Sequence, residues 1–101
     1  MNYLEDLKKS SGKLEAFICL KSELVDFTDN PTLQCMYLQL AEYLIETEPF
    51  YVCVYVADIA LRAQDQTALL AFVRCHKETF QQHTDLHDVV QCLKIIDQEG
   101  L

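Results

Sequence analysis

The residues best suited to chemistry lie near the C-terminal end of the chain, where cysteine and histidine occur close together. Thiolate and imidazole groups at short spacing are ligands that Zn²⁺ prefers, and this cluster consists of Cys75, His76, His83, His87 and Cys92. A helix cap at Thr84 or Asp85 is expected to separate the two later histidines. No pair has zinc-finger spacing. We therefore expect helix-end histidines and core cysteines, with no metal and no other cofactor.

Asp58 is the second candidate, because it is an acid in an otherwise apolar stretch. A carboxylate in such a place must be paired, hydrogen-bonded or raised in pKa. Arg62 stands four residues later, in the acid-before-base order that favours an ion pair within a helix. We expect this pair to form. Because no second carboxylate is placed for general acid–base chemistry, we do not expect catalysis here.

Other enzyme chemistries are nearly excluded by composition. The chain has only two glycines, so it contains no phosphate-cradling loop, dinucleotide fingerprint or nucleophile elbow. Its serines, Ser10, Ser11 and Ser22, lie near the N-terminus outside any triad-like context. The sequence therefore predicts that the protein is not an enzyme.

Composition predicts one small helical domain. The 101 residues are 50% hydrophobic and include only two prolines, which disfavours both disorder and turn-rich β architectures. We expect a single domain over residues 1–101, with residues 1–11 loosely ordered. Five cysteines without a Cys-x-x-Cys pair, and the absence of a secretory signal, predict reduced, buried thiols in the cytoplasm or another intracellular compartment. No apolar run reaches the roughly 20 residues of a membrane span, so no membrane partner is expected.

The most apolar stretch, Thr47–Ala63, is predicted to be a central helix around which the rest of the chain packs. Thr47 is a suitable N-cap, and Pro49 is tolerated in a first helical turn. Four more helices are expected from apolar periodicity and capping signals: about Gly12–Phe27 after a cap at Ser10 or Ser11, from Asn30-Pro31 to about Ile45, about Gln66–Phe80 after a cap at Asp65, and about Leu86–Gln98.

These elements predict an all-α fold of about five helices packed as antiparallel helical hairpins. The link before the central helix is so short that the two helices it joins must be antiparallel neighbours. The helices begin at similar intervals along the chain, on the scale of helix-pair repeats. A small bundle and a short α-solenoid both remain open.

Part of the chain resembles a known helical-repeat family. The similarity is carried by Asn30-Pro31-Thr32-Leu33, Glu48-Pro49-Phe50, Ala60-Leu61-Arg62 and Thr67-Ala68-Leu69-Leu70-Ala71-Phe72. Over about Asn30–Phe72, the chain resembles one stretch of the repeats in the TROVE modules of Ro and telomerase-associated proteins. The resemblance implies HEAT-like packing of helical hairpins and small-RNA binding. The chain is much shorter than those modules and lacks their basic surface.

Charge and tyrosine content favour a protein partner. The net charge is −8, and no basic residue occurs between Lys21 and Arg62, so binding to nucleic acid is not expected. Tyrosine is enriched at protein interfaces. The predicted partner-binding residues are Tyr37, Leu38, Tyr43, Tyr51 and Tyr55, with Glu42 and Glu46 as an acidic rim. A basic or amphipathic helix is the expected occupant, and self-association is a second expectation. A purely structural role for these tyrosines in the core also remains open.

The favoured function is a small intracellular protein–protein interaction module: an adaptor, a scaffold subunit or a chaperone-like binder. The alternative is an RNA-associated helical-repeat module that uses the basic residues Lys8, Lys9, Lys13, Arg74, Lys77 and Lys94.

Overall fold

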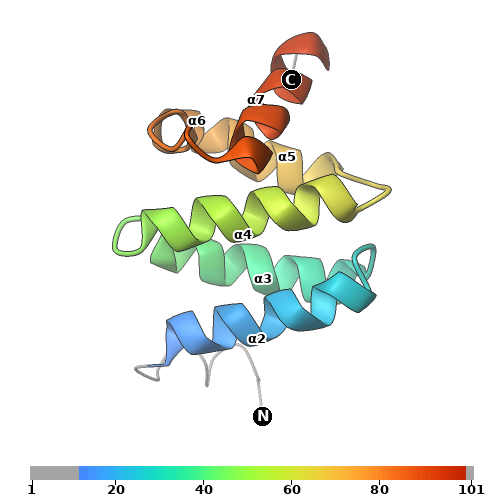
Figure 1. The fold of residues 1–101 in the computed structure, drawn as a ribbon. Coiled ribbons are helices and arrows are strands. Elements are labelled where there is room, and N and C mark those ends of the chain that lie inside the picture. Colours follow the sequence, from blue (N-terminus) through green and yellow to red (C-terminus); the bar gives the residue numbers. More distant parts are fainter. Residues whose placement is uncertain (1–11, 100–101) are drawn as a thin grey trace.

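The computed structural model describes residues 12–99, and within them every regular element is an α-helix. The helices are α2 (Lys13–Asp26), α3 (Pro31–Leu44), α4 (Pro49–Arg62), α5 (Thr67–Cys75), α6 (Lys77–Gln81) and α7 (His87–Glu99) (Figure 1). The all-α prediction is confirmed. The expectations for residues 1–11, including a cap at Ser10 or Ser11, lie outside the described residues.

Helix α4 is the central element, as its composition predicts. It contacts α2, α3, α5, α6 and α7, and the side chains of Val52, Val56 and Ile59 are fully buried among them. Each such aliphatic side chain contributes roughly 1.5–3 kcal/mol when it leaves water. The other helices therefore gain much of their stability by packing against α4.

The helices stack as hairpins in two layers (Figure 1). Helices α2, α4 and α7 lie in one layer, and α3 and α5 lie behind them. Each long helix contacts the next one along the chain, and α2 contacts α4, α3 contacts α5, and α4 contacts α7. Helices α3 and α4 run antiparallel, as the short connection between them requires.

The predicted helix caps at Asn30, Thr47 and Asp65 have three different outcomes. The side chain of Asn30 accepts a hydrogen bond from the Leu33 N–H at 3.0 Å, so this N-cap is confirmed. The cap expected at Thr47 is wrong: Glu48 holds the N-cap position of α4, and the Thr47 hydroxyl donates backward to the Leu44 carbonyl oxygen at 3.4 Å. Asp65 precedes the N-cap of α5 by one residue, but its Oδ1 still accepts from the Thr67 N–H at 3.1 Å.

The expected helix over Gln66–Phe80 is broken into α5 and α6 at His76, whose backbone lies at φ −113° and ψ 31°. The ring of His76 packs on Phe72 at a centroid distance of 4.6 Å and reaches Glu42 on α3. After the bend at His76, the ring of Phe80 lies edge-on to that of Phe72, and Phe80 is completely buried. Long-range packing therefore overrides a local pattern that favours one continuous helix.

The loops at one end of the stack are held together by side chains. Asp29 accepts hydrogen bonds from the backbone N–H groups of Gln64 at 3.1 Å and Asp65 at 3.0 Å. The Gln66 amide donates to the Ala60 carbonyl oxygen at 2.7 Å, and the Gln34 amide donates to that of Thr28. These bonds fix the start of α5 relative to the start of α3.

Candidate functional site

Tyr37 lies in the core, which corrects its assignment to a partner-binding surface. Its side chain is fully buried and its ring stacks on Phe17 at a centroid distance of 4.5 Å. Burial, and to a smaller degree the charge of Asp58 and the neighbouring Tyr55, raise the pKa of its phenol. Tyr37 is therefore a neutral core residue that offers no surface to a partner.

Tyr51 and Tyr55 lie on the side of α4 that adjoins α2. Tyr55 lies 5.9 Å from the ring of Phe17 and 6.0 Å from that of Tyr51, measured between centroids. The Lys21 ammonium is 5.2 Å from the centroid of Tyr55, a cation–π distance. Tyr55 is partly covered, whereas 39% of Tyr51 is exposed, so Tyr51 is the more accessible of the two.

Asp58 forms the expected pair with Arg62, at 3.0 Å, and a second one with Lys21 on α2, at 2.8 Å. Partial burial is the largest single influence and raises the pKa of Asp58. The hydrogen bonds from Lys21 and Arg62, together with their charges, outweigh burial, so the net pKa is lowered. Asp58 is thus an ionised link between two helices, which explains its place in an apolar stretch without a catalytic role.

Leu38 and Glu42 lie on another side of the molecule, toward α5 and α6. Glu46 lies in the turn between α3 and α4. Leu38 lines a surface groove together with α5 residues. The Glu42 carboxylate lies 2.8 Å from the His76 Nε2. Glu46 borders a hollow of about 360 Å³ that Pro49 and His76 also line. The residues predicted to form one surface are therefore divided between the core and separate parts of the surface.

The strongest concentration of exposed aromatic surface flanks the turn between α3 and α4. Phe50 is 49% exposed and Tyr51 is 39% exposed, and their rings meet edge to face at 5.8 Å. Glu46 and Glu48 lie in the same turn. We call these four residues, Glu46, Glu48, Phe50 and Tyr51, the aromatic corner.

Two further aromatic groups adjoin the aromatic corner or lie near it. His83, from the connection between α6 and α7, lies 6.1 Å from the ring of Phe50. Tyr43, which is 53% exposed, lies on the α3 side of the turn, with the Lys13 ammonium 6.0 Å from its ring. Phe50 is absent from the predicted site residues. Its signal in the sequence is its position directly after the polar turn Glu46-Thr47-Glu48 and Pro49.

The aromatic corner is also acidic. Within the described part of the chain, neither Glu46 nor Glu48 takes part in an ion pair. A pair of carboxylates beside exposed rings attracts cationic side chains.

The cysteines and histidines do not converge. Cys92 is buried with its thiol 3.7 Å from the Ala57 carbonyl oxygen, and burial, followed by the charge of Asp88, raises its pKa to about 12. Burial likewise raises the pKa of Cys53 to about 12. The prediction of buried thiols is wrong for the exposed Cys19, Cys35 and Cys75. Among residues 12–99, no group of three or more His, Cys, Asp or Glu side chains is placed to hold a metal ion.

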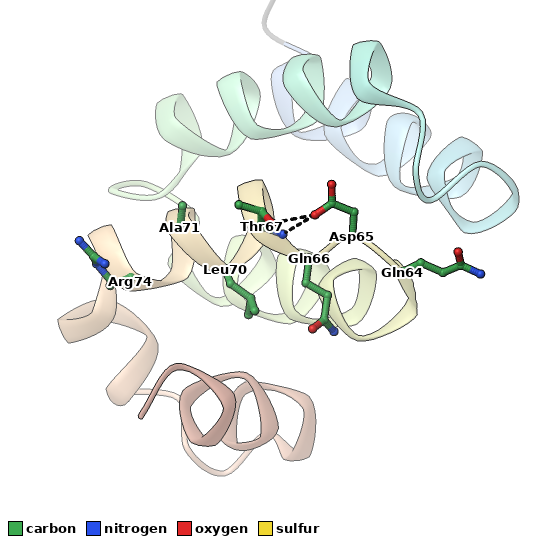
Figure 2. Close-up of a pocket in the computed structure, with 7 residues that line it drawn as sticks. All are labelled: Gln64, Asp65, Gln66, Thr67, Leu70, Ala71 and Arg74. Carbon is green, nitrogen blue, oxygen red and sulfur yellow. Dashed lines mark hydrogen bonds between the residues drawn. The ribbon is translucent and has the colours of Figure 1, made fainter. Parts of the chain in front are cut away.

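Two neighbouring hollows adjoin α5 and share Asp65, Thr67 and Ala71. One, of about 310 Å³, lies at its N-terminal end and is lined by Gln64, Asp65, Gln66, Thr67, Leu70, Ala71 and Arg74 (Figure 2). The other, of about 480 Å³, is a groove between α3 and α5 that Leu38 lines.

The described basic residues of the RNA hypothesis come from separate helices, and Lys77 is paired with Asp97 at 3.2 Å. Lys8 and Lys9 lie outside the described residues.

No described helix combines the length and the apolar character that crossing a lipid bilayer requires. Comparisons of the chain with known protein families, with characterised proteins and with solved structures give no significant match.

Proposed function

We propose that this protein is an interaction module whose aromatic corner binds a basic, partly apolar segment of a partner protein. The observation that carries the proposal is the exposure of Phe50 and Tyr51 beside Glu46 and Glu48, for which the described residues provide no cation. An intracellular adaptor, scaffold subunit or chaperone-like binder would use such a surface.

The energetics of the aromatic corner suit a binding surface. Removing apolar area from water contributes about 25 cal/mol per Å², and aromatic side chains are prominent among residues that dominate interface energies. Carboxylates at the edge of such a surface speed association with a cationic partner and select against acidic ones. Phe50 and Tyr51 would supply most of the affinity, and Glu46 and Glu48 most of the charge selectivity.

The hollow beside the aromatic corner supports a cationic occupant. It holds about 360 Å³ and is lined by Ile45, Glu46, Pro49, His76, Thr79 and Gln82. A lysine or arginine side chain has an apolar stem and a charged end. The stem would lie against Pro49 and Ile45 while the charged end approaches Glu46.

Affinity capture with matched variants tests this proposal. The immobilised wild-type protein and the Phe50→Gln/Tyr51→Gln double variant would be exposed to cell extract, and retained proteins quantified by mass spectrometry. Phe27→Gln is the control, because Phe27 is 63% exposed but lies in the connection between α2 and α3. We expect the double variant to retain roughly tenfold less of a specific partner than the wild type does. A tenfold loss of affinity corresponds to about 1.4 kcal/mol. Equal retention by all three proteins would contradict the proposal.

The acidic part of the aromatic corner is tested by salt. Glu46→Gln/Glu48→Gln is expected to weaken capture at low salt and to flatten its dependence on ionic strength, because exposed charges are screened within about 10 Å at 0.1 M salt. If the salt dependence of capture equals that of the wild type, the two carboxylates do not take part in binding.

A further inference from the structure

A second surface with binding character lies between α3 and α5. It is a groove of about 480 Å³ lined by Pro31, Gln34, Cys35 and Leu38 from α3 and by Asp65, Thr67, Ala68 and Ala71 from α5 and the residues before it. We call it the outer groove. Its α5 wall presents the exposed alanines 68 and 71, and Figure 2 shows Ala71 and Thr67 on one side of α5 with Leu70 on the other.

The walls of the outer groove favour a helical occupant. Small side chains such as those of Ala68 and Ala71 let another helix approach closely, and packed helices normally lie 8–10 Å apart. The backbone groups of α3 and α5 are used within the helices themselves, so the groove offers no edge to which an extended peptide can pair. A helix satisfies its own backbone hydrogen bonds and needs only an apolar face.

The charges around the outer groove favour a basic occupant. Asp65 lines one end, and Glu42, one turn beyond Leu38, lies beside His76 at the other. Arg74, three residues after Ala71 on α5, lines the adjoining hollow, which shares Asp65, Thr67 and Ala71 with the outer groove (Figure 2). The net charge of −8 also opposes the docking of a second copy of this chain.

We infer that the outer groove binds an amphipathic helix of a basic partner, with the apolar face of that helix against Leu38, Ala68 and Ala71 and its cationic side chains toward Asp65 and Glu42. Tyr51 and Tyr55 lie on the side of α4 that adjoins α2, whereas the outer groove lies between α3 and α5. The outer groove is therefore a site separate from Tyr51, and a chain with both sites can bridge two partners.

Fluorescence anisotropy with synthetic helices tests the inference. The probe is a labelled peptide of about 15 residues, long enough to be helical, with leucines spaced three and four residues apart on one face and lysines and alanines elsewhere. The matched probe carries glutamate in place of every lysine. At low salt, the full-length protein is expected to bind the lysine peptide and not the glutamate peptide.

Filling the outer groove identifies the site. Ala71→Trp and Ala68→Trp place a large ring on exposed helix positions, so both variants are expected to keep the wild-type circular dichroism spectrum. Each is expected to weaken binding of the lysine peptide by roughly tenfold or more. The control is Gln98→Trp, an exposed position on α7, which is expected to bind as the wild type does. Phe50→Gln/Tyr51→Gln is also expected to keep full binding of this peptide.

Four results would overturn the inference. The first is equal binding of the two peptides, and the second is wild-type affinity in both tryptophan variants. If binding instead falls only in the Phe50→Gln/Tyr51→Gln variant, the peptide sits on the aromatic corner, and the inference fails while the proposed function stands. The last result is a dimer, detected by light scattering, that Ala71→Trp dissociates. It would show that a second copy of the chain, and not a basic partner, occupies the outer groove.

Discussion

Tyr37 and Tyr51 carry the same side chain on neighbouring helices, but only one of them can meet a partner. Tyr37 falls at three- and four-residue steps from Leu33, Leu40 and Ala41, so its place in the apolar stripe of its helix was a signal for the core. Residue type favoured an interface for both. Periodicity is the better guide here, because it reports which face of the helix a residue occupies.

The hydroxyl of Tyr37 gives a prediction at this scale, because no other group of residues 12–99 forms a hydrogen bond with it. Tyr37→Phe keeps the stacking on Phe17 and removes a buried polar atom. The free energy of unfolding, measured by urea denaturation, is expected to stay unchanged or to rise by up to about 1 kcal/mol. Tyr37→Ala, by comparison, is expected to lose about 3–5 kcal/mol. A loss above about 1 kcal/mol in Tyr37→Phe would mean that the hydroxyl has a partner.

Asp58 gives a prediction about pH. Its pKa is lower in the folded protein than in the unfolded chain, so its ionised form stabilises the fold above the unfolded pKa of about 3.9. That stabilisation disappears as the pH falls through the folded pKa. Asp58→Asn is expected to lower the free energy of unfolding by about 1 kcal/mol at pH 7, since Lys21 and Arg62 remain partly exposed.

Urea denaturation at pH 7 and pH 3 measures this effect. The difference between the wild type and Asp58→Asn should shrink at pH 3, whereas the exposed control Glu15→Gln should show little difference at either pH. A constant difference for Asp58→Asn across this range would show that its charge is not responsible.

At the scale of elements, the helix starts differ in how well local sequence predicts them. Asn30-Pro31 specifies its own boundary, because the Asn30 side chain bonds the Leu33 N–H within the same turn. The break at His76 and the contact between Lys21 and Asp58 depend on residues distant in sequence. Local patterns therefore predicted the helices and the Asp58–Arg62 pair, but not the division of the fourth helix or the second partner of Asp58.

The Asn30 cap gives the element-scale prediction. Asn30→Ala removes the bond to the Leu33 N–H and is expected to lower the free energy of unfolding by about 1 kcal/mol. Thr32→Ala is the matched control, since Thr32 is exposed in the same turn. Chemical denaturation of both variants makes the comparison. An equal effect of the two substitutions would mean that the cap adds nothing beyond local helix propensity.

At the scale of the whole molecule, the stacking of the hairpins decides which predicted residues lie together. It buries Tyr37, places Tyr51 on the aromatic corner, and directs Leu38 into the outer groove. The net charge and the tyrosine content were evident from the sequence. The distribution of the predicted site residues over two surfaces was not evident from the sequence, because it depends on how α2 and α5 pack on opposite sides of α3.

Site-specific photo-cross-linking tests the central claim most directly. A benzophenone amino acid would replace Phe50 in one protein and Phe27 in another. Both side chains are exposed, but Phe50 lies in the first turn of α4 and Phe27 lies directly after α2. After irradiation in cell extract, we expect a discrete cross-linked partner at position 50 that is absent at position 27 and is suppressed by Glu46→Gln/Glu48→Gln. The same products at both positions, or none at position 50, would contradict the claim that the aromatic corner is a binding surface.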